Sequence, residues 1–144
     1  MKVSIASDHA GFEEKQLLVE YLKELGHEVL DRGPQDDGRV DYPDFAELVA
    51  RDVASGEAER GVLVCGTGIG MAIAANKVDG IRAANVTTPE FAALAREHND
   101  ANIVTVSGRF VSDEVNREIV SAFLQTAFGG GRHEGRVQKI MALE

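Results

Sequence analysis

The residues best suited to chemistry in this chain lie in one short segment, VLVCGTGIGMAIAANK, over positions 62–77. Cys65 is the only cysteine of the chain, and it is followed by glycines at alternate positions, Gly66, Gly68 and Gly70. An apolar run, a glycine-rich turn and a run of small residues predict a strand, a tight turn and a helix. The backbone N–H groups at the start of such a helix suit a phosphate or a developing oxyanion.

The thiol of Cys65 has two interpretations. Beside the N-terminus of a helix the thiolate is favoured, and a thiolate can act as a base. A lone cysteine is also commonly a small buried hydrophobic side chain. The glycine turn favours the first interpretation because it removes side chains from around the sulfur, but the residues alone leave both open.

Two familiar phosphate-binding motifs do not fit this turn. A dinucleotide fingerprint needs a third glycine where Met71 stands, and the next predicted strand has no acid at its end to hold a ribose. A cysteine-phosphatase loop needs an arginine six residues after the cysteine, and that position is again Met71.

Other candidate groups lie in SDHAG near the N-terminus and in EHND at 97–100. Asp8 can bind a ligand or cap the helix that follows, and His9 can bind a ligand or bond to backbone. His98 ends a predicted helix, where the helix dipole favours a cationic histidine without any further role.

Arg132 and Arg136 are four residues apart at the start of the last predicted helix, so they share one face. Cations at a helix N-terminus oppose the helix dipole, and a bound phosphate would remove that conflict. The alternative is that both arginines form surface ion pairs with Glu134 or other acids.

Apolar runs alternate with helical patterns along the whole chain, and TPE at 88–90 has the cap, proline and acid of a helix opening. The patterns predict strands over 2–7, 28–31, 61–65, 81–86 and 102–107, and helices over 11–25, 44–54, 69–77, 88–98, 112–128 and 132–143. We therefore expect a single domain over 1–144 with a three-layer α/β/α Rossmann-like fold and a five-stranded parallel sheet. Ligands of such sheets bind at the carboxyl ends of the strands, where the loops after 7, 31, 65, 86 and 107 would meet.

The net charge of −9 argues against nucleic acid or an anionic membrane as a partner. No long apolar segment is present, and the N-terminus becomes polar too soon for a signal peptide. A single cysteine forms no intrachain disulfide, so we expect a cytoplasmic protein.

Six motifs occur in the order in which they are found in one known family: SDHAGF, DYPD, CGTGIGMAIAANK, GIRAA, HNDAN and GGRHEGRV. On these motifs the chain resembles, over essentially its whole length, the RpiB/LacAB family of sugar-phosphate isomerases, which includes ribose-5-phosphate isomerase B. The resemblance implies an aldose–ketose isomerase that needs no metal or organic cofactor. It also implies a homodimer or a dimer of dimers with active sites shared between subunits. The last helix, about 132–143, would pack on the domain or across the dimer.

The resemblance also implies residue roles. Cys65 would be the base that moves a proton between C1 and C2, because the glutamate used by another branch of the family is replaced by Met71. His98 would help to open the sugar ring, and the region of His98, Asn99 and Arg109 would come from the partner chain. The groups that would bind the sugar phosphate are Asp8, His9, Tyr42, Gly66, Thr67, Gly68, Ile69, Gly70, Asn99, Arg109, Arg132 and Arg136.

Isomerisation through an enediolate requires a base, stabilisation of an oxyanion and proton transfer at O1 and O2. Either Thr67 or Asp8 could carry out that proton transfer. Ribose 5-phosphate is the leading substrate, and allose, galactose or tetrose phosphates are alternatives within the class. A non-catalytic nucleotide-binding module on the same fold is the alternative from another class, although the dinucleotide spacing is wrong for it.

Overall fold

In the computed structural model, which describes residues 1–144, five strands form one parallel sheet in the order β2-β1-β3-β5-β4. The strands are β1 (Lys2–Ser7), β2 (Glu28–Asp31), β3 (Arg60–Cys65), β4 (Ala83–Asn85) and β5 (Ile103–Ser107). The three central strands are almost entirely buried, as expected of strands covered by helices on both faces. Their carboxyl ends meet at one edge of the sheet.

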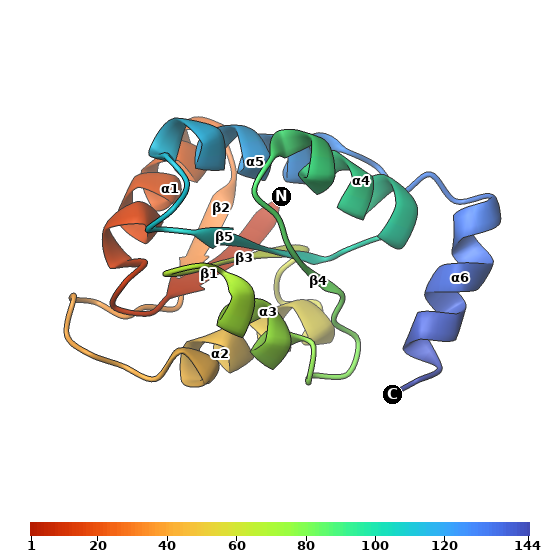
Figure 1. The fold of residues 1–144 in the computed structure, drawn as a ribbon, viewed down its shortest axis with the longest axis horizontal. Helices are drawn as coiled ribbons and strands as arrows, with labels where there is room; N and C mark the ends of the chain where they lie inside the picture. The colour runs from red at the N-terminus through yellow and green to blue at the C-terminus, as the bar shows by residue number, and fades with distance from the viewer.

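The helices are α1 (Phe12–Glu24), α2 (Tyr42–Ser55), α3 (Ile69–Ala75), α4 (Pro89–Asn99), α5 (Asp113–Gln125) and α6 (Arg132–Met141). Figure 1 shows α1, α4 and α5 on one face of the sheet and α2 and α3 on the other. Each face has its own apolar core, one centred on Phe123, Ile119 and Leu18 and the other on Met71, Leu63 and Val49. The predicted three-layer α/β fold with a five-stranded parallel sheet is confirmed.

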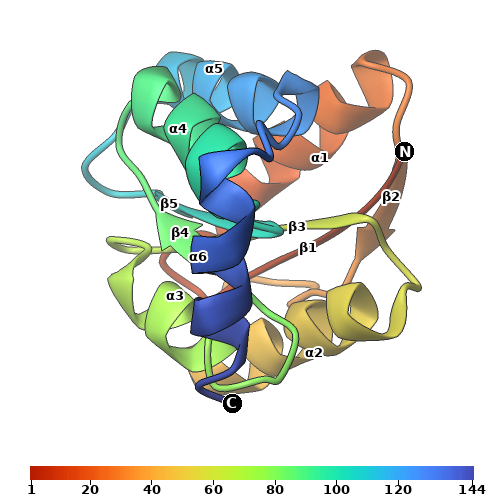
Figure 2. The same cartoon turned by 90° about the vertical axis from the view of Figure 1, so that its right-hand side faces the viewer.

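Helix α6 lies outside the three layers and crosses the end of the sheet at which the strands begin (Figures 1 and 2). Two polar contacts hold its C-terminal end: Arg82 donates to Met141 Sδ at 3.2 Å, and the Gly80 N–H donates to the Glu144 carboxylate at 2.9 Å. A cavity of about 550 Å³ separates the rest of this end from the body of the domain. The helix ends at Met141, two residues earlier than predicted.

Two predicted boundaries are wrong because side chains compete for the backbone. The predicted strand 81–86 contains only three residues of regular strand, since Asn102 Oδ1 accepts the Arg82 N–H and Asn76 Oδ1 accepts the Ala83 N–H. The helix predicted over 112–128 ends at Gln125, because Thr126 is already extended, with φ −90° and ψ 126°. The Thr126 carbonyl accepts a hydrogen bond from the Arg96 side chain, not from a backbone N–H of a further helical turn.

Helix α2 begins at Tyr42, two residues before the predicted start, with Pro43 in its first turn. Proline suits that turn because its missing N–H would have no partner there. None of the helices is both long enough and apolar enough to cross a membrane.

Candidate active site

Cys65 ends β3 and is 6 % exposed, with its sulfur in the smaller apolar core and at the start of α3. The Gly68 N–H donates a hydrogen bond to Sγ at 3.1 Å. A donor at this distance, at the N-terminus of a helix, stabilises a thiolate more than a neutral thiol. The side chain therefore has features of both interpretations: it is buried, and its sulfur is placed for chemistry.

Glycine is required at position 68 in this turn. Its φ is +83°, and a Cβ there would lie 2.3 Å from Asn85 Nδ2 and 3.0 Å from the carbonyl oxygen of Val106. Thr105 Oγ1 donates to the Gly68 carbonyl at 2.8 Å, and the Asn85 amide donates to the Thr67 carbonyl at 3.3 Å. The ends of β4 and β5 thus fix the turn from one side.

The remaining residues of the turn meet two side chains from other loops. Arg109 lies over Gly66, where a Cβ would come 3.3 Å from its Nη1, and the ring of Tyr42 occupies the space beside Gly70. Thr67 is exposed, and its Oγ1 accepts the N–H of Ile69, the first residue of α3. The Ile69 side chain is itself about half exposed. The structure therefore places Tyr42 and Arg109, two of the predicted binding residues, next to the Cys65 turn.

The first loop adds an acid and a histidine at the same edge of the sheet. Asp8 is 8 % exposed, and its Oδ1 accepts the Gly11 N–H at 3.0 Å, so it does hold the start of α1. His9 Nδ1 accepts the Val40 N–H at 3.3 Å, which leaves its proton on Nε2 in the neutral ring. Asp8 thus bonds to the start of the helix, and His9 bonds to backbone, as one interpretation of each residue predicted. His9 also lines a cavity of about 350 Å³.

A second group of predicted site residues lies at the opposite edge of the sheet. The rings of His98 and His133 stack with their centroids 4.3 Å apart and their planes 18° apart. Partial burial, and next the charges of His98 and the two arginines of α6, lower the pKa of His133. Arg132 and Arg136 are exposed in the first turns of α6, and neither takes part in an ion pair. The ion-pair alternative for these arginines is therefore wrong for the isolated chain.

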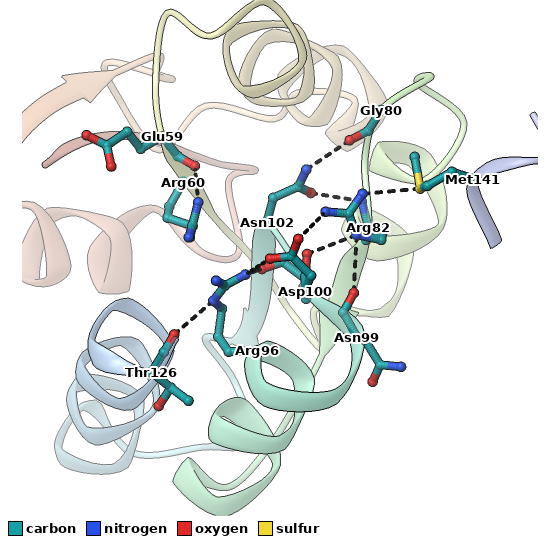
Figure 3. A network of polar contacts seen from close by, with 11 residues as sticks. Glu59, Arg60, Gly80, Arg82, Arg96, Asn99, Asp100, Asn102, Thr126 and Met141 are labelled. Atoms are coloured by element: carbon teal, nitrogen blue, oxygen red, sulfur yellow. Dashed lines mark hydrogen bonds and ion pairs between the residues drawn. The ribbon is translucent and has the colours of Figure 1, made fainter. Parts of the chain in front are cut away.

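The end of α4 is fixed by two arginines, the buried Arg96 and the partly buried Arg82, which Figure 3 shows converging on Asp100. Asp100 has a left-handed backbone, with φ 47°, and its carboxylate accepts from Arg96 at 2.8 Å and from Arg82 at 3.3 Å. Arg82 also donates to the carbonyl of Asn99 at 3.2 Å. The side chain of Asn99 is exposed next to this network, so the network holds the backbone that carries His98 and Asn99.

The two groups are separated by the length of the sheet. Cys65 pairs with Ser107 at the carboxyl end of β5, whereas His98 precedes Ile103, which begins that strand. Four residues of strand span ~13 Å before any loop is added. In Figure 1 the Cys65 turn is at the left end of the sheet, and α6 and the end of α4 are at the right. The expected grouping of Arg109 with His98 and Asn99 is therefore wrong within this chain, because Arg109 lies on Gly66.

Sequence reasoning assigned no role to several residues that shape the site. Asn85 supports the turn from the end of β4, a position where a polar residue after a strand could have been noticed. Ser107, at the end of β5, donates from Oγ to the Gly66 carbonyl at 2.7 Å. Arg82 and Arg96 lack such a signal, because a charged residue at a strand or helix end is usually exposed.

The fold and this edge define a class of protein: a parallel α/β domain that holds a thiol and a glycine-rich turn at the carboxyl ends of its strands. Comparisons with known proteins make the class specific. The sequence model of the ribose/galactose isomerase family matches residues 3–140, and the chain therefore belongs to that family.

Ribose-5-phosphate isomerase B from Escherichia coli strain K12 is 46 % identical over 143 residues, which cover 99 % of this chain and 96 % of that protein. The solved structure of ribose-5-phosphate isomerase B from Clostridium thermocellum has a TM-score of 0.98 and 48 % identity, with 99 % of this chain and 97 % of that chain covered. The enzyme from Mycoplasma genitalium, solved with bound ribulose 5-phosphate, has a TM-score of 0.95 and 46 % identity, with 99 % of this chain and 95 % of that chain covered.

Proposed function

We propose that this enzyme interconverts ribose 5-phosphate and ribulose 5-phosphate. One observation carries the proposal: the chain matches, over nearly its whole length and at 46 % identity, a relative that was solved with bound ribulose 5-phosphate. The local geometry supports the same chemistry, because it holds a thiol against backbone donors where strands end.

In the proposed reaction the thiolate of Cys65 removes the proton from C2 of the open-chain aldose and returns it to C1. The pair of electrons from the C2–H bond forms the enediolate, whose oxygen is stabilised by N–H groups of the turn at 66–70. O1 and O2 exchange a proton through Thr67 or Asp8. Each side chain already accepts one backbone N–H, but Thr67 is exposed whereas Asp8 is buried, so Thr67 is the better placed of the two to reach a substrate.

The proposal requires two chains for each site. His98 is to assist ring opening, and Arg132 and Arg136 are to hold the phosphate together with Asn99, but all four lie at the far edge of their own sheet. A two-fold axis that brings the α4–α6 edge of one chain to the Cys65 edge of another completes two equivalent sites. Arg109 and His9 then contribute from the Cys65 side.

Exposed apolar side chains support such an association. Ile69 and Ile73 of α3, Phe91 of α4 and Phe110 after β5 are 54 %, 60 %, 60 % and 78 % exposed. All four lie at or near the carboxyl edge, on or beside the elements that surround the Cys65 turn. Large apolar side chains gathered around a site in this way are typical of a surface that a second subunit covers.

A panel of aldose phosphates tests the proposed activity. Pentose, hexose and tetrose phosphates are compared by kcat/KM, each measured by appearance of the ketose. We expect the highest kcat/KM with ribose 5-phosphate, since the relatives compared above carry that name. A higher kcat/KM with a hexose or tetrose phosphate would contradict the assigned substrate.

A further inference from the structure

Two carboxyl groups face each other where α1 and α5 begin. Glu14 is only 8 % exposed, and it lies within hydrogen-bonding reach of Asp113, in the first turn of α5. Glu14 Oε1 and Asp113 Oδ1 are both buried without a hydrogen-bond partner. Two ionised carboxylates cannot bond to each other, whereas one proton between them would satisfy both oxygens.

The groups around the pair favour that shared proton. Burial, and next the hydrogen bond and charge of Asp113, raise the pKa of Glu14 to about 7. Asn116 and Arg117 of α5 act in the opposite direction, and Arg117 already bonds to the other oxygen of Asp113 at 2.8 Å. The charged or titratable side chains that line the adjoining 350 Å³ cavity with Glu14 are His9, Glu13 and Asp37.

The pair lies directly behind the loops of the candidate site. Helix α1 follows the loop that carries Asp8 and His9, and α5 follows the loop that carries Arg109. One turn along α5, Asn116 donates to the carbonyl of Ser107 at 2.9 Å. Ser107 Oγ in turn donates to the carbonyl of Gly66.

Close backbone packing transmits any movement of these helix ends to the thiol. The Gly108 N–H donates to the Cys65 carbonyl at 2.9 Å. A Cβ on Gly11 would lie 2.6 Å from the carbonyl oxygen of Val64, so the start of α1 rests on the end of β3. Repulsion between ionised Glu14 and Asp113 would push the two loops apart, away from the turn that they contact.

We propose that Glu14 is a positioning residue: its protonated carboxyl donates to Asp113 and holds the first and fifth loops together around the Cys65 turn. This inference rests on the proposed isomerase function, because the groups it positions, Asp8, His9 and Arg109, are those assigned to the sugar phosphate. When Glu14 ionises, the loops separate and the substrate binds more weakly. The effect falls on KM more than on kcat, since Glu14 touches neither the thiol nor the reacting carbons.

The test compares Glu14→Gln with Glu13→Gln at about pH 6 and about pH 8.5, on either side of the pKa of Glu14. A glutamine amide donates to Asp113 at both pH values, whereas Glu13→Gln removes the same charge from an exposed neighbour on the same turn. We expect the ratio of wild-type to Glu14→Gln kcat/KM to fall by about tenfold from the lower to the higher pH. The fall should come from a higher KM of the wild type, with kcat little changed. Any pH dependence that is common to all variants cancels in this ratio. Glu13→Gln should follow the wild type.

A second variant and a second measurement guard against a misfolded glutamine variant. Asp113→Asn can donate to ionised Glu14, so it should also remove the pH-dependent loss. The raised pKa of Glu14 means that its contribution to stability is complete below about pH 4.5 and is lost as the pH rises through about 7. The melting temperature of the wild type should therefore fall between pH 6 and pH 8.5 relative to that of either variant.

Equal pH dependence of KM in the wild type and both variants, or an equal effect of Glu13→Gln, would overturn the positioning role. Turnover of ribose 5-phosphate by the wild type at about pH 6 tests the proposed function separately. If that turnover is absent, the proposed function fails, and the melting series still decides whether the two carboxyl groups share a proton.

Discussion

At the scale of single residues, the sulfur of Cys65 combines burial with a hydrogen bond that favours the thiolate. Its 6 % exposure excludes bulk water from most of its surface, and the Gly68 N–H lies 3.1 Å away. A base in such a place can act on a carbon acid that enters the turn, since water competes little for its charge. The sequence alone placed this thiol correctly at the end of a buried strand and next to a glycine turn.

Cys65→Ala should lower kcat for ribose 5-phosphate by about 10²- to 10⁴-fold, the usual contribution of a general base. The fold should survive, because a small side chain replaces another in the core. Cys65→Ser serves as the control for turn geometry: its oxygen can accept the Gly68 N–H but is a poor base at neutral pH, so it should lose as much activity. Activity of the alanine variant within tenfold of the wild type would remove Cys65 from the role of base.

Arg132 and Arg136 have no acidic partner in the chain, so a phosphate is the anion proposed for them. The double variant Arg132→Ala/Arg136→Ala should raise KM by an amount equivalent to about 2–3 kcal/mol, and inorganic phosphate should inhibit it only weakly. Arg51→Ala is the matched control, because Arg51 is exposed on α2 and pairs only with Glu47. An unchanged inhibition constant for phosphate in the double variant would refute the assignment.

At the scale of helices and strands, the pattern of apolar residues predicted each element, and polar side chains decided where several of them end. The opening at Thr88 was predictable, since its Oγ1 accepts the Phe91 N–H as a cap. The late start of β4 and the early end of α5 were not, because they depend on Asn76, Asn102 and Arg96, which lie 7, 20 and 30 residues from the residues they bond.

Lys15 is the clearest residue that patterning could not place. It is completely buried in α1, where its ammonium donates to Asp31 at 2.8 Å and to the carbonyl of Pro34 at 3.0 Å. Lysine is almost never fully buried unless it is paired. The partners of Lys15 lie in another segment of the chain and come close to it only in the folded structure, so the sequence pattern does not reveal the pair. The contact ties α1 to the segment that leads from β2 toward Tyr42.

Lys15→Met should therefore lower the free energy of unfolding by about 3 kcal/mol, because it removes the cation from the Asp31 carboxylate, which keeps only the Gly33 N–H, and leaves a buried carbonyl without its donor. Urea unfolding followed by circular dichroism measures the loss. Lys23→Met is the control on the same helix, since Lys23 is exposed and pairs only with Glu20 at 3.5 Å; it should change stability by less than ~0.5 kcal/mol. A similar effect of both substitutions would show that the buried pair contributes little.

At the scale of the whole molecule, the candidate site residues form two groups at opposite edges of one sheet. Sequence reasoning named members of both groups, since each belongs to a recognisable motif. Motif order along a chain does not give position across a sheet, so the motifs alone do not separate His98 from Cys65. The predicted alternation of strand and helix does separate them: α4 runs back from the carboxyl edge, so its last residues lie at the amino edge.

Each active site, as proposed above, combines the Cys65 edge of one chain with the α4–α6 edge of another. The direct test is to co-express Cys65→Ala with Arg132→Ala/Arg136→Ala, purify the mixed oligomer with two different tags, and measure kcat/KM with ribose 5-phosphate at low substrate. One intact site re-forms in each mixed pair, from Cys65 of one chain and the arginines of the other. Since one of its two sites is intact, the purified mixed dimer should have about half of the wild-type activity, although each parent variant is nearly inactive. Activity of the purified mixed oligomer no higher than the sum of its two parents would contradict the shared site.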